Sequence, residues 1–311
     1  MSRGLRILVP ALVAVGVCAA AVYVAYPELI LRALSASARR SAGLERRTVE
    51  TGGHRIVYLD GGSGPPVVLL HGFGVSKDLW NSVAAQLTPT YRVIVPDLPG
   101  FGESSFRETE RYDAESQATR LRAFLDALGV HEHHLGGNSM GGSISAVYAA
   151  SYPKSTLSLL IGAAPGVRSP GKSELDRRLA AGENPMLVRD GDDFDALIGL
   201  VFFRPPSIPG PLKRAMLATA IRRQAAYAKI FDDLRDAGEG ALEPLLPRIR
   251  ARTLVLWGER DRIVDPSSVA VFTAAIARSE SVVFAACGHA LPRECPDLLS
   301  QHYRTFLASA P

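Results

Sequence analysis

Three residues of this sequence have side chains suited to nucleophilic catalysis: Ser139, Asp261 and His289. A serine hydroxyl is a poor nucleophile until a base removes its proton, and histidine is the side chain best suited to that role. An aspartate beside the histidine would orient the imidazole and balance the charge that the ring acquires. The three residues therefore predict covalent catalysis through a serine, provided that the fold brings them together.

The surroundings of Ser139 favour this role. The serine lies in the segment GNSMGG, residues 137–142, directly after an apolar strand-like run and directly before an alanine-rich helical stretch. A serine in such a strand-to-helix turn needs glycine two positions before it and two after it, because side chains there would collide with neighbouring backbone. Gly137 and Gly141 meet that need. The helix that follows would also direct its free N–H groups towards a docked ester oxygen.

Asp261 and His289 lie where a parallel sheet would place them. Each residue follows a strand-like run, and the order Ser, Asp, His along the chain is the order that this architecture requires. The carboxyl ends of parallel strands meet at one edge of a sheet, so the three loops can converge. Taken singly, the aspartate would be interpreted as a turn former and the histidine as a structural residue. Their combination with Ser139 favours a catalytic triad.

A glycine-containing loop is the candidate for an oxyanion hole. The segment HGFG, residues 71–74, follows an apolar run of the expected sheet. Such a loop presents a backbone N–H towards the serine. We expect the main-chain amides of Phe73 and Met140 to be the two donors. His71 is interpreted as a structural residue of the loop, because His289 already fills the role of the base.

Apolar strand-like runs alternate with helical stretches over most of the chain. The expected strands are residues 47–50, 54–59, 66–70, 92–96, 133–136, 156–161, 252–257 and 281–285. The helices expected in the same alternation are residues 115–128, 141–151, 266–278 and 296–307. Strand followed by helix predicts right-handed crossovers and a parallel sheet with helices on both faces. The predicted fold class is therefore α/β, with a doubly wound, mostly parallel sheet.

The alternation breaks between residues 166 and 247, where the sequence becomes helical and loop-rich. Residues 192–200 and 212–234 are expected to form helices around a proline-rich turn. We interpret this stretch as a helical lid inserted between two strands of the sheet. Its apolar side chains either form an acyl pocket or only pack the lid onto the core, and those considered are Phe194, Phe202, Phe203 and Met216.

A run of twenty uncharged residues, 7–26, follows Arg3 and Arg6 near the amino terminus. A helix of that length spans roughly 30 Å, the thickness of the hydrocarbon core of a bilayer. A cleaved signal sequence is the alternative, but the apolar run continues past the small residues at 19–21 where cleavage would occur. We therefore expect a single-pass membrane anchor, and arginines on both flanks leave its orientation open.

These features divide the chain into four parts. Residues 1–28 are expected to form the membrane anchor, and residues 29–46 a linker that is either an amphipathic link on the membrane surface or a plain helical linker. The α/β core is assigned to residues 47–165 and 248–311, with the lid at residues 166–247 between its two halves.

The bulk composition excludes several other classes of protein. The 311 residues carry a formal net charge of +4 from 35 basic and 31 acidic side chains, without a basic tract of the kind that binds nucleic acid.

Of the three cysteines, Cys287 and Cys295 could pair in an oxidising compartment, but the favoured interpretation leaves them free. The histidines of the segment HEHH, residues 131–134, are interpreted as part of a solvated loop, and no metal or organic cofactor is expected. The segment DLPGFG, residues 97–102, lacks the lysine of a phosphate loop and is interpreted as a turn on the rim of the site.

From about residue 47 to the carboxyl terminus, the sequence resembles the α/β-hydrolase superfamily. The segments that carry the resemblance are HGFG (71–74), DLPG (97–100), GNSMGG (137–142), WGERD (257–261) and GH (288–289). The anchor, residues 71–80 and the lid are similar to those of membrane-anchored monoacylglycerol lipases and related bacterial lipases. This resemblance implies a serine esterase that acts on lipid esters, with Ser139, Asp261 and His289 as its triad.

Two other functions share part of this pattern. The segment GNSMGG also resembles that of serine hydrolases that cleave carbon–carbon bonds in ring-fission products of aromatic compounds. In those soluble enzymes an aromatic residue commonly follows the catalytic histidine, whereas Ala290 stands here. A hydrolase-fold protein that binds a ligand without catalysis is the other alternative, and the intact set of three residues disfavours it. We therefore predict an ester hydrolase whose partners are a lipid or small ester substrate and a membrane.

Overall fold

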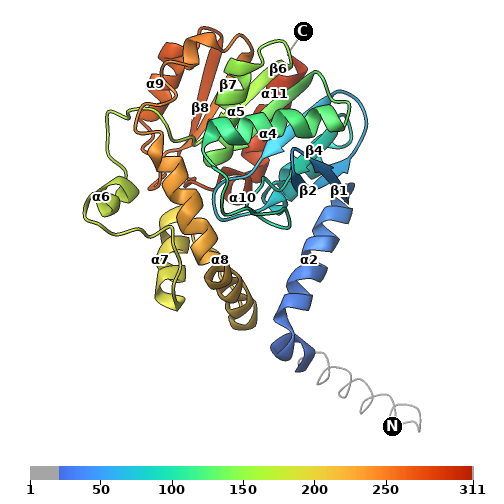
Figure 1. Ribbon diagram of the computed structural model, residues 1–311, viewed down its shortest axis with the longest axis vertical. Coiled ribbons are helices and arrows are strands. Elements are labelled where there is room, and N and C mark those ends of the chain that lie inside the picture. The colour runs from blue at the N-terminus through green and yellow to red at the C-terminus, as the bar shows by residue number, and fades with distance from the viewer. Residues whose placement is uncertain (1–20, 310–311) are drawn as a thin grey trace, which may run out of the picture.

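One eight-stranded sheet with helices on both faces forms the body of the chain in a computed structural model, which we describe for residues 21–309 (Figure 1). The strands are β1 (Leu44–Thr51), β2 (His54–Gly61), β3 (Pro66–Leu70), β4 (Arg92–Pro96), β5 (His133–Asn138), β6 (Thr156–Gly162), β7 (Arg252–Gly258) and β8 (Ser279–Phe284). Their order across the sheet is β1-β2-β4-β3-β5-β6-β7-β8. The pairings of β1 with β2 and of β2 with β4 are antiparallel, and the remaining pairings in this sheet are parallel. The predicted α/β class with a mostly parallel sheet is confirmed.

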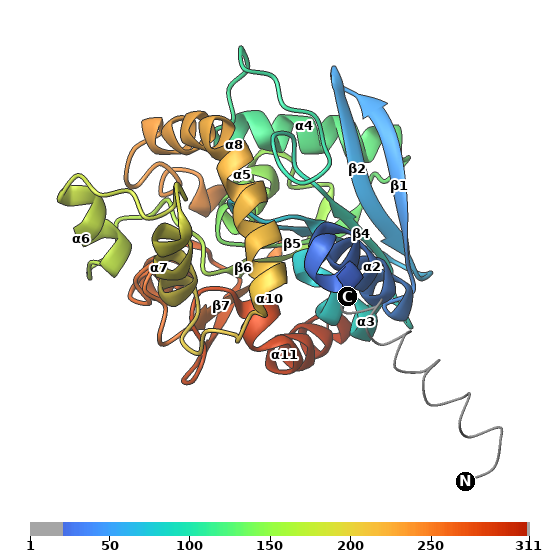
Figure 2. The same ribbon diagram turned by 90° about the horizontal axis from the view of Figure 1, so that it is seen from below.

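The helices fill the connections between strands and cover both faces of the sheet (Figure 2). The α-helices are α2 (Pro27–Ser41), α3 (Asn81–Leu87), α4 (Ala114–Ala127), α5 (Met140–Ser151), α6 (Glu174–Ala180), α7 (Gly191–Val201), α8 (Gly210–Asp236), α9 (Ser268–Ala275), α10 (Leu291–Glu294) and α11 (Pro296–Ala308). Two short 3-10 helices are η1 (Lys77–Trp80) and η2 (Leu246–Arg248).

Strand β3 shows why the central runs of the sequence are apolar without interruption. Successive side chains of a strand point to opposite faces of the sheet. Val68 and Leu70 belong to the core that includes residues of α4, α5 and α9, whereas Val67 and Leu69 belong to the core that includes residues of α3 and α11. Both faces of the strand are therefore buried, as the expected parallel arrangement requires.

The topology places four loops at the carboxyl ends of the parallel strands, on one edge of the sheet. Strand β5 lies between β3 and β6 in the middle of the sheet, and the loops after β3 and β5 therefore lie side by side. Strands β7 and β8 are neighbours, so the loops that follow them also lie side by side. This edge of the sheet carries the segments that the sequence singled out.

Between β6 and β7 the chain leaves the sheet for residues 163–251, which we call the helical segment. It contains α7 and α8, within two residues of the predicted bounds, and a shorter α6 that the sequence pattern did not indicate. Ser173 caps α6: its hydroxyl accepts from the Asp176 N–H, and the Asp176 carboxylate accepts in return from the Ser173 N–H. Helix α8 is tied to the body because the Arg223 guanidinium donates to the main-chain carbonyls of Gly100 and Gly102.

Helix α2 is packed on the body near α8 and η1. The Arg39 guanidinium donates to both carboxylate oxygens of Asp78, which fixes the helix to the segment that follows the HGFG loop. Within residues 21–309, no helix has both the length and the apolar character needed to cross a membrane. The predicted anchor, residues 7–26, lies almost entirely outside the residues that the structure describes.

The interpretation of residues 131–134 as a solvated loop is wrong for its last two histidines. His133 and His134 begin β5, where a strand was expected, and both are buried because this strand lies in the middle of the sheet between β3 and β6. The ring of His134 contacts the Ser158 hydroxyl on the neighbouring strand at 2.8 Å. Within residues 21–309, no group of histidine, cysteine and acidic side chains is arranged as a metal site.

Candidate active site

Ser139 occupies a strained turn between β5 and α5. Its backbone angles are φ 58° and ψ −126°, in a region that residues other than glycine rarely adopt. The turn is held by the Ser139 N–H, which donates to the Gly162 carbonyl on β6 at 2.7 Å. Such a conformation costs on the order of 1–3 kcal/mol and persists only where the surroundings impose it.

The two glycines that flank the serine at a distance of two residues allow this turn. A Cβ atom on Gly137 would overlap the backbone of Gly141 and lie 2.6 Å from the Gly142 nitrogen. A Cβ atom on Gly141 would overlap the Leu70 carbonyl and lie 2.6 Å from the His71 carbonyl oxygen. The spacing of glycines in the sequence therefore reflects close contact between α5, its own strand and β3.

Asp261 and His289 form a buried hydrogen-bonded pair. The Asp261 Oδ2 atom lies 2.8 Å from His289 Nδ1, and each residue is only 6% exposed. The other carboxylate oxygen of Asp261 accepts from the N–H groups of Ile263 at 2.8 Å and Val264 at 3.0 Å. These bonds fix the carboxylate, and the carboxylate in turn orients the imidazole, with Nε2 as the ring nitrogen left to act on a proton.

The histidine loop contacts the serine turn directly. Asn138, the residue before Ser139, donates from its side-chain amide to the main-chain carbonyl of His289 at 3.2 Å. The structure therefore brings the segments of the three predicted triad residues to one edge of the sheet.

The HGFG loop borders the serine. A Cβ atom built on Gly72 would lie 3.2 Å from the Ser139 Cβ and 3.7 Å from its Oγ. Met140 is the first residue of α5, so its amide belongs to the free N-terminal end of that helix. The amides of Phe73 and Met140 therefore belong to the two segments that meet at Ser139.

His71 has a structural role in this loop, as the sequence indicates. Its Nδ1 atom lies 2.7 Å from the Gly72 carbonyl, and its Nε2 accepts from the Leu98 N–H at 3.0 Å. Burial lowers the pKa of the ring, so the imidazole is held in its neutral form. A neutral ring with both nitrogens engaged holds the HGFG loop against the segment at 97–102.

A buried charge cluster behind the HGFG loop was missed by the sequence reasoning. The Lys77 ammonium lies 2.7 Å from an Asp97 carboxylate oxygen and 2.8 Å from Glu103, and Lys77 and Asp97 are almost fully buried. Although burial raises the pKa of Glu103, hydrogen bonds and charges from Arg46 and Lys77 outweigh this effect and lower it to about 2. The predicted rim turn is therefore anchored through Asp97. The sequence shows Asp97 in the segment at 97–102 and a lysine six residues after His71, but not that the two form an ion pair.

The four pocket candidates of the helical segment lie in different environments. Phe194 is buried and Phe202 is half-buried, whereas Phe203 is 40% exposed and Met216 is 37% exposed. The guanidinium groups of Arg204 and Arg260 both lie over the Phe203 ring.

An aromatic cluster that the sequence did not single out covers the HGFG loop. The Phe73 ring contacts Phe101 at a centroid distance of 5.8 Å, and it contacts Tyr227 and Phe231 of α8 at 5.4 and 5.6 Å. Helix α8 therefore lies over the expected oxyanion loop.

The loop that carries His289 is closed by a disulfide, which corrects the interpretation of free cysteines. Cys287 and Cys295 are paired, with their Cα atoms 6.3 Å apart. Helix α10 turns the chain back after His289, so residues eight positions apart meet at the base of the loop. Spacing in the sequence alone does not show this turn.

Comparison with known proteins places this geometry in a family. The sequence profile of the alpha/beta hydrolase fold matches residues 65–193. Lipase 1 of Psychrobacter immobilis is 33% identical, over 86% of this chain and 86% of its own. The chain belongs to the α/β-hydrolase family. It is a carboxylic ester hydrolase, as the lipases among its relatives indicate.

Two further α/β hydrolases resemble the chain over nearly its whole length. The crystal structure of a membrane phospholipase A, described as a bacterial virulence factor, has a TM-score of 0.90 and 42% identity, and the match covers 98% of both chains. Monoacylglycerol lipase abhd6-B of Xenopus laevis is 25% identical, over 92% of this chain and 89% of its own.

Proposed function

We propose that this α/β hydrolase cleaves single-chain lipid esters, such as monoacylglycerols, through a triad of Ser139, His289 and Asp261. The main support for the proposal is the buried pair of Asp261 and His289. The loop that carries His289 is hydrogen-bonded to Asn138, the residue before Ser139 in the strained turn. The names of its relatives support a lipid substrate, because they include a lipase, a monoacylglycerol lipase and a membrane phospholipase A.

The reaction begins with proton transfer from Ser139 Oγ to His289 Nε2 while Oγ attacks the ester carbonyl carbon. Negative charge then develops on the carbonyl oxygen, and the main-chain amides of Phe73 and Met140 stabilise it. Asp261 stabilises the imidazolium, which gives its proton to the departing alcohol as the acyl-enzyme forms. Water, deprotonated by His289, attacks the acyl-enzyme, and the fatty acid leaves as Ser139 regains its proton.

Within this proposal, residues 166–247 act as a lid on a core formed by residues 47–165 and 248–311. Helix α8 covers the Phe73 loop through Tyr227 and Phe231, which supports an acyl site beneath it. The acyl pocket would draw on the apolar residues of this segment, with Phe194 as its buried member.

The same proposal gives the chain a membrane anchor at residues 1–28. The linker assigned to residues 29–46 consists largely of α2, which is packed on the body, and ends with the first residues of β1. Figure 1 shows α2, α7 and the first half of α8 extending from the same side of the body. Exposed apolar side chains occur on these elements and near them, namely Val22, Val24, Tyr26, Leu29, Leu34, Phe203, Met216 and Ile221. An anchored enzyme would turn this side towards lipid, so a poorly soluble ester could enter without crossing water.

The disulfide supports one orientation of the proposed anchor. Disulfides persist in oxidising compartments and are rare where glutathione keeps thiols reduced. The pairing of Cys287 with Cys295 therefore favours a catalytic domain on the exported side of the membrane.

The proposal is tested by hydrolysis of a monoacylglycerol and of a short-chain p-nitrophenyl ester by the purified chain. Ser139→Ala is expected to abolish both activities, while Ser151→Ala, an exposed serine at the end of α5, retains them. Turnover by the wild type that survives Ser139→Ala would overturn the triad. Failure of the folded wild type on every ester would direct the search to carbon–carbon bond hydrolysis, starting with an aromatic ring-fission product.

Membrane placement is tested by removal of residues 1–26. Truncation at Leu44, the start of β1, would also remove α2, which is bonded to Asp78 through Arg39 and belongs to the folded body. The shorter truncation is expected to lower activity on vesicle-embedded ester and to spare the soluble ester. Equal loss on both substrates would contradict a role of this segment in membrane placement.

A further inference from the structure

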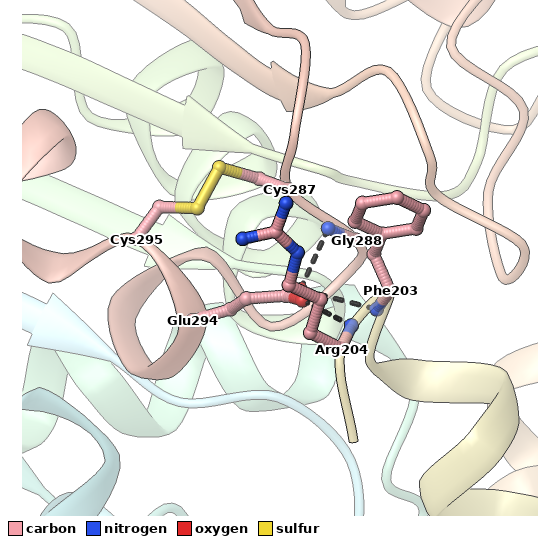
Figure 3. Close-up of a disulfide and its surroundings, with 6 residues drawn as sticks. All are labelled: Phe203, Arg204, Cys287, Gly288, Glu294 and Cys295. Atoms are coloured by element: carbon pink, nitrogen blue, oxygen red, sulfur yellow. Dashed lines mark hydrogen bonds between the residues drawn. A yellow bond between two sulfur atoms is a disulfide. The ribbon is translucent and has the colours of Figure 1, made fainter. Parts of the chain in front are cut away.

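The carboxylate of Glu294 lies between the histidine loop and the chain that leaves α7 (Figure 3). Its Oε2 atom accepts from the Gly288 N–H at 2.6 Å and from the Phe203 N–H at 3.3 Å. Its Oε1 atom accepts from the Arg204 N–H at 2.7 Å. Hydrogen bonds to an ionised carboxylate are stronger than those between neutral groups. One side chain therefore joins the residue before His289 to two residues of the helical segment.

A second contact joins the same two stretches of chain through their backbones. The His289 N–H donates to the carbonyl of Val201, the last residue of α7, at 2.9 Å. A Cβ atom on Gly288 would lie 2.6 Å from the Phe203 nitrogen and 3.0 Å from the Val201 oxygen. Only glycine permits this approach without displacement of the backbone. The helical segment therefore holds the backbone around His289 through two sets of hydrogen bonds. One is the direct bond to the Val201 carbonyl, and the other passes through the Glu294 carboxylate.

The disulfide joins the two residues that flank the hydrogen bond between Gly288 and Glu294. Cys287 immediately precedes Gly288, and Cys295 immediately follows Glu294 (Figure 3). The covalent bond therefore restrains both ends of the hydrogen bond between Gly288 and Glu294, in addition to closing the loop that contains His289.

The aspartate loop is linked to the same point. The Arg260 N–H donates to the Cys287 carbonyl at 3.0 Å, and Arg260 directly precedes Asp261. The Arg260 guanidinium also lies 5.8 Å from the centre of the Phe203 ring, within the range of a cation–π contact. The loops of Asp261 and His289 and the helical segment therefore meet around Glu294 and the disulfide.

We propose that Glu294 is a positioning residue for His289, and that the Cys287–Cys295 disulfide holds Glu294 in place for that role. The inference rests on the proposed function, in which His289 is the base that activates Ser139. A base must stay within hydrogen-bond distance of the proton that it removes, and a misplacement of about 1 Å can cost about 100-fold in rate. Among the described residues, the Glu294 carboxylate is hydrogen-bonded to the main chain at Gly288, Phe203 and Arg204 and not to Ser139 or the imidazole, so it acts through the backbone.

The test compares Glu294→Ala and Glu294→Gln with the wild type in two assays. One is the rate at which a fluorophosphonate probe labels Ser139, and the other is kcat and KM for a short-chain p-nitrophenyl ester. Glu294→Ala is expected to slow labelling and kcat by about 10- to 100-fold. KM is expected to change by no more than about twofold, because a short acyl chain makes little use of the pocket proposed in the helical segment. Glu294→Gln keeps the volume and one acceptor oxygen and is expected to give an intermediate rate.

Hydrogen exchange supplies a readout that catalysis does not. In Glu294→Ala the amides of Phe203, Arg204 and Gly288 are expected to exchange faster, since they lose their acceptor. Glu280→Ala is the matched control, because Glu280 is an exposed glutamate on β8. It is expected to leave labelling, kcat and exchange unchanged.

Reduction of the disulfide tests its part in the proposal separately. A phosphine reductant is expected to slow labelling of the wild type severalfold and to have no further effect on Glu294→Ala, because the disulfide acts through Glu294. Wild-type labelling per folded molecule in both Glu294 variants would overturn the positioning role while leaving the triad intact. Absence of labelling at Ser139 in the wild type would overturn the proposed function, and this inference with it.

Discussion

The side-chain amide of Asn138 donates to the main-chain carbonyl of His289 across 3.2 Å. Asn138 ends β5 and directly precedes Ser139, so the strand that delivers the proposed nucleophile also holds the loop of the proposed base. The contact is buried, with Asn138 only 3% exposed. This hydrogen bond, between residues 151 positions apart in sequence, therefore helps to set the distance between Ser139 and His289 from the side of the sheet.

Asn138→Ala is expected to lower kcat for a soluble ester by about fivefold, because a buried hydrogen bond contributes about 1 kcal/mol and the loss falls on the position of His289. Asn138→Asp has the same shape but cannot donate when ionised, and its oxygen would face the carbonyl oxygen. It is expected to lose more activity than Asn138→Ala. The measurement is kcat for the soluble ester in both variants. An Asn138→Asp variant with the kcat of the wild type would show that Asn138 does not position His289.

Gly141→Ala is expected to lower the free energy of unfolding by about 3 kcal/mol or more, because its Cβ would overlap the Leu70 carbonyl and lie 2.6 Å from the His71 oxygen. Gly199→Ala is the matched control. Gly199 lies within α7, and a Cβ there would meet no atom within 4 Å. It is expected to be neutral or to stabilise by about 0.5–1 kcal/mol. Urea unfolding measures both, and equal stability of the two variants would refute the packing argument.

The parts of the fold and the site that could be predicted from the sequence depend on local patterns. Strand β3 was predicted with the correct bounds because its side chains are buried on both faces, which leaves an uninterrupted apolar run. The segment around Ser139 was recognisable because contacts with its backbone require Gly137 and Gly141 at fixed spacing. The positions of Asp261 and His289 could be predicted because each follows a strand, and the carboxyl ends of parallel strands lie at the same edge of a sheet.

Contacts between distant residues left no comparable pattern. The partner of Lys77 is Asp97, twenty positions away, and the two segments that contain these residues do not show by themselves that the side chains meet. Glu294 resembles any glutamate at the end of a short helix until its carboxylate is seen beside Arg204, ninety positions earlier. The pairing of Cys287 with Cys295 depends on the turn made by α10. These features follow from tertiary structure, and spacing alone does not specify it.

Lys77→Met is expected to lower the free energy of unfolding by about 3–5 kcal/mol, because it leaves the buried Asp97 carboxylate without its cation. Lys154→Met, at an exposed position, is expected to change stability by no more than about 0.5 kcal/mol. The comparison uses chemical unfolding at pH 7.5. If the two variants were equally stable, the ion pair would not anchor the turn at residues 97–102 as we describe.

His133 is expected to make the fold sensitive to acid. Burial lowers the pKa of its ring to about 4, and the charges of His134 and Arg122 act in the same direction. Neither ring nitrogen has a hydrogen-bond partner within the described part of the chain, so the folded protein holds the ring in its neutral form. The unfolded chain binds the proton near pH 6.5. Stability from this group is therefore fully present above pH 6.5 and is lost as the pH falls towards 4, by about 3 kcal/mol in all.

His133→Leu removes this titration, so its stability relative to the wild type is expected to rise by about 3 kcal/mol between pH 7.5 and pH 4. Other acid-sensitive groups, His134 among them, affect both proteins and cancel in the difference. His131→Leu is the control, since His131 is exposed and its removal is expected to leave the pH dependence of the wild type nearly unchanged. Urea unfolding at half-unit steps of pH measures all three proteins. Parallel curves for the wild type and His133→Leu would show that the buried ring does not carry the acid sensitivity.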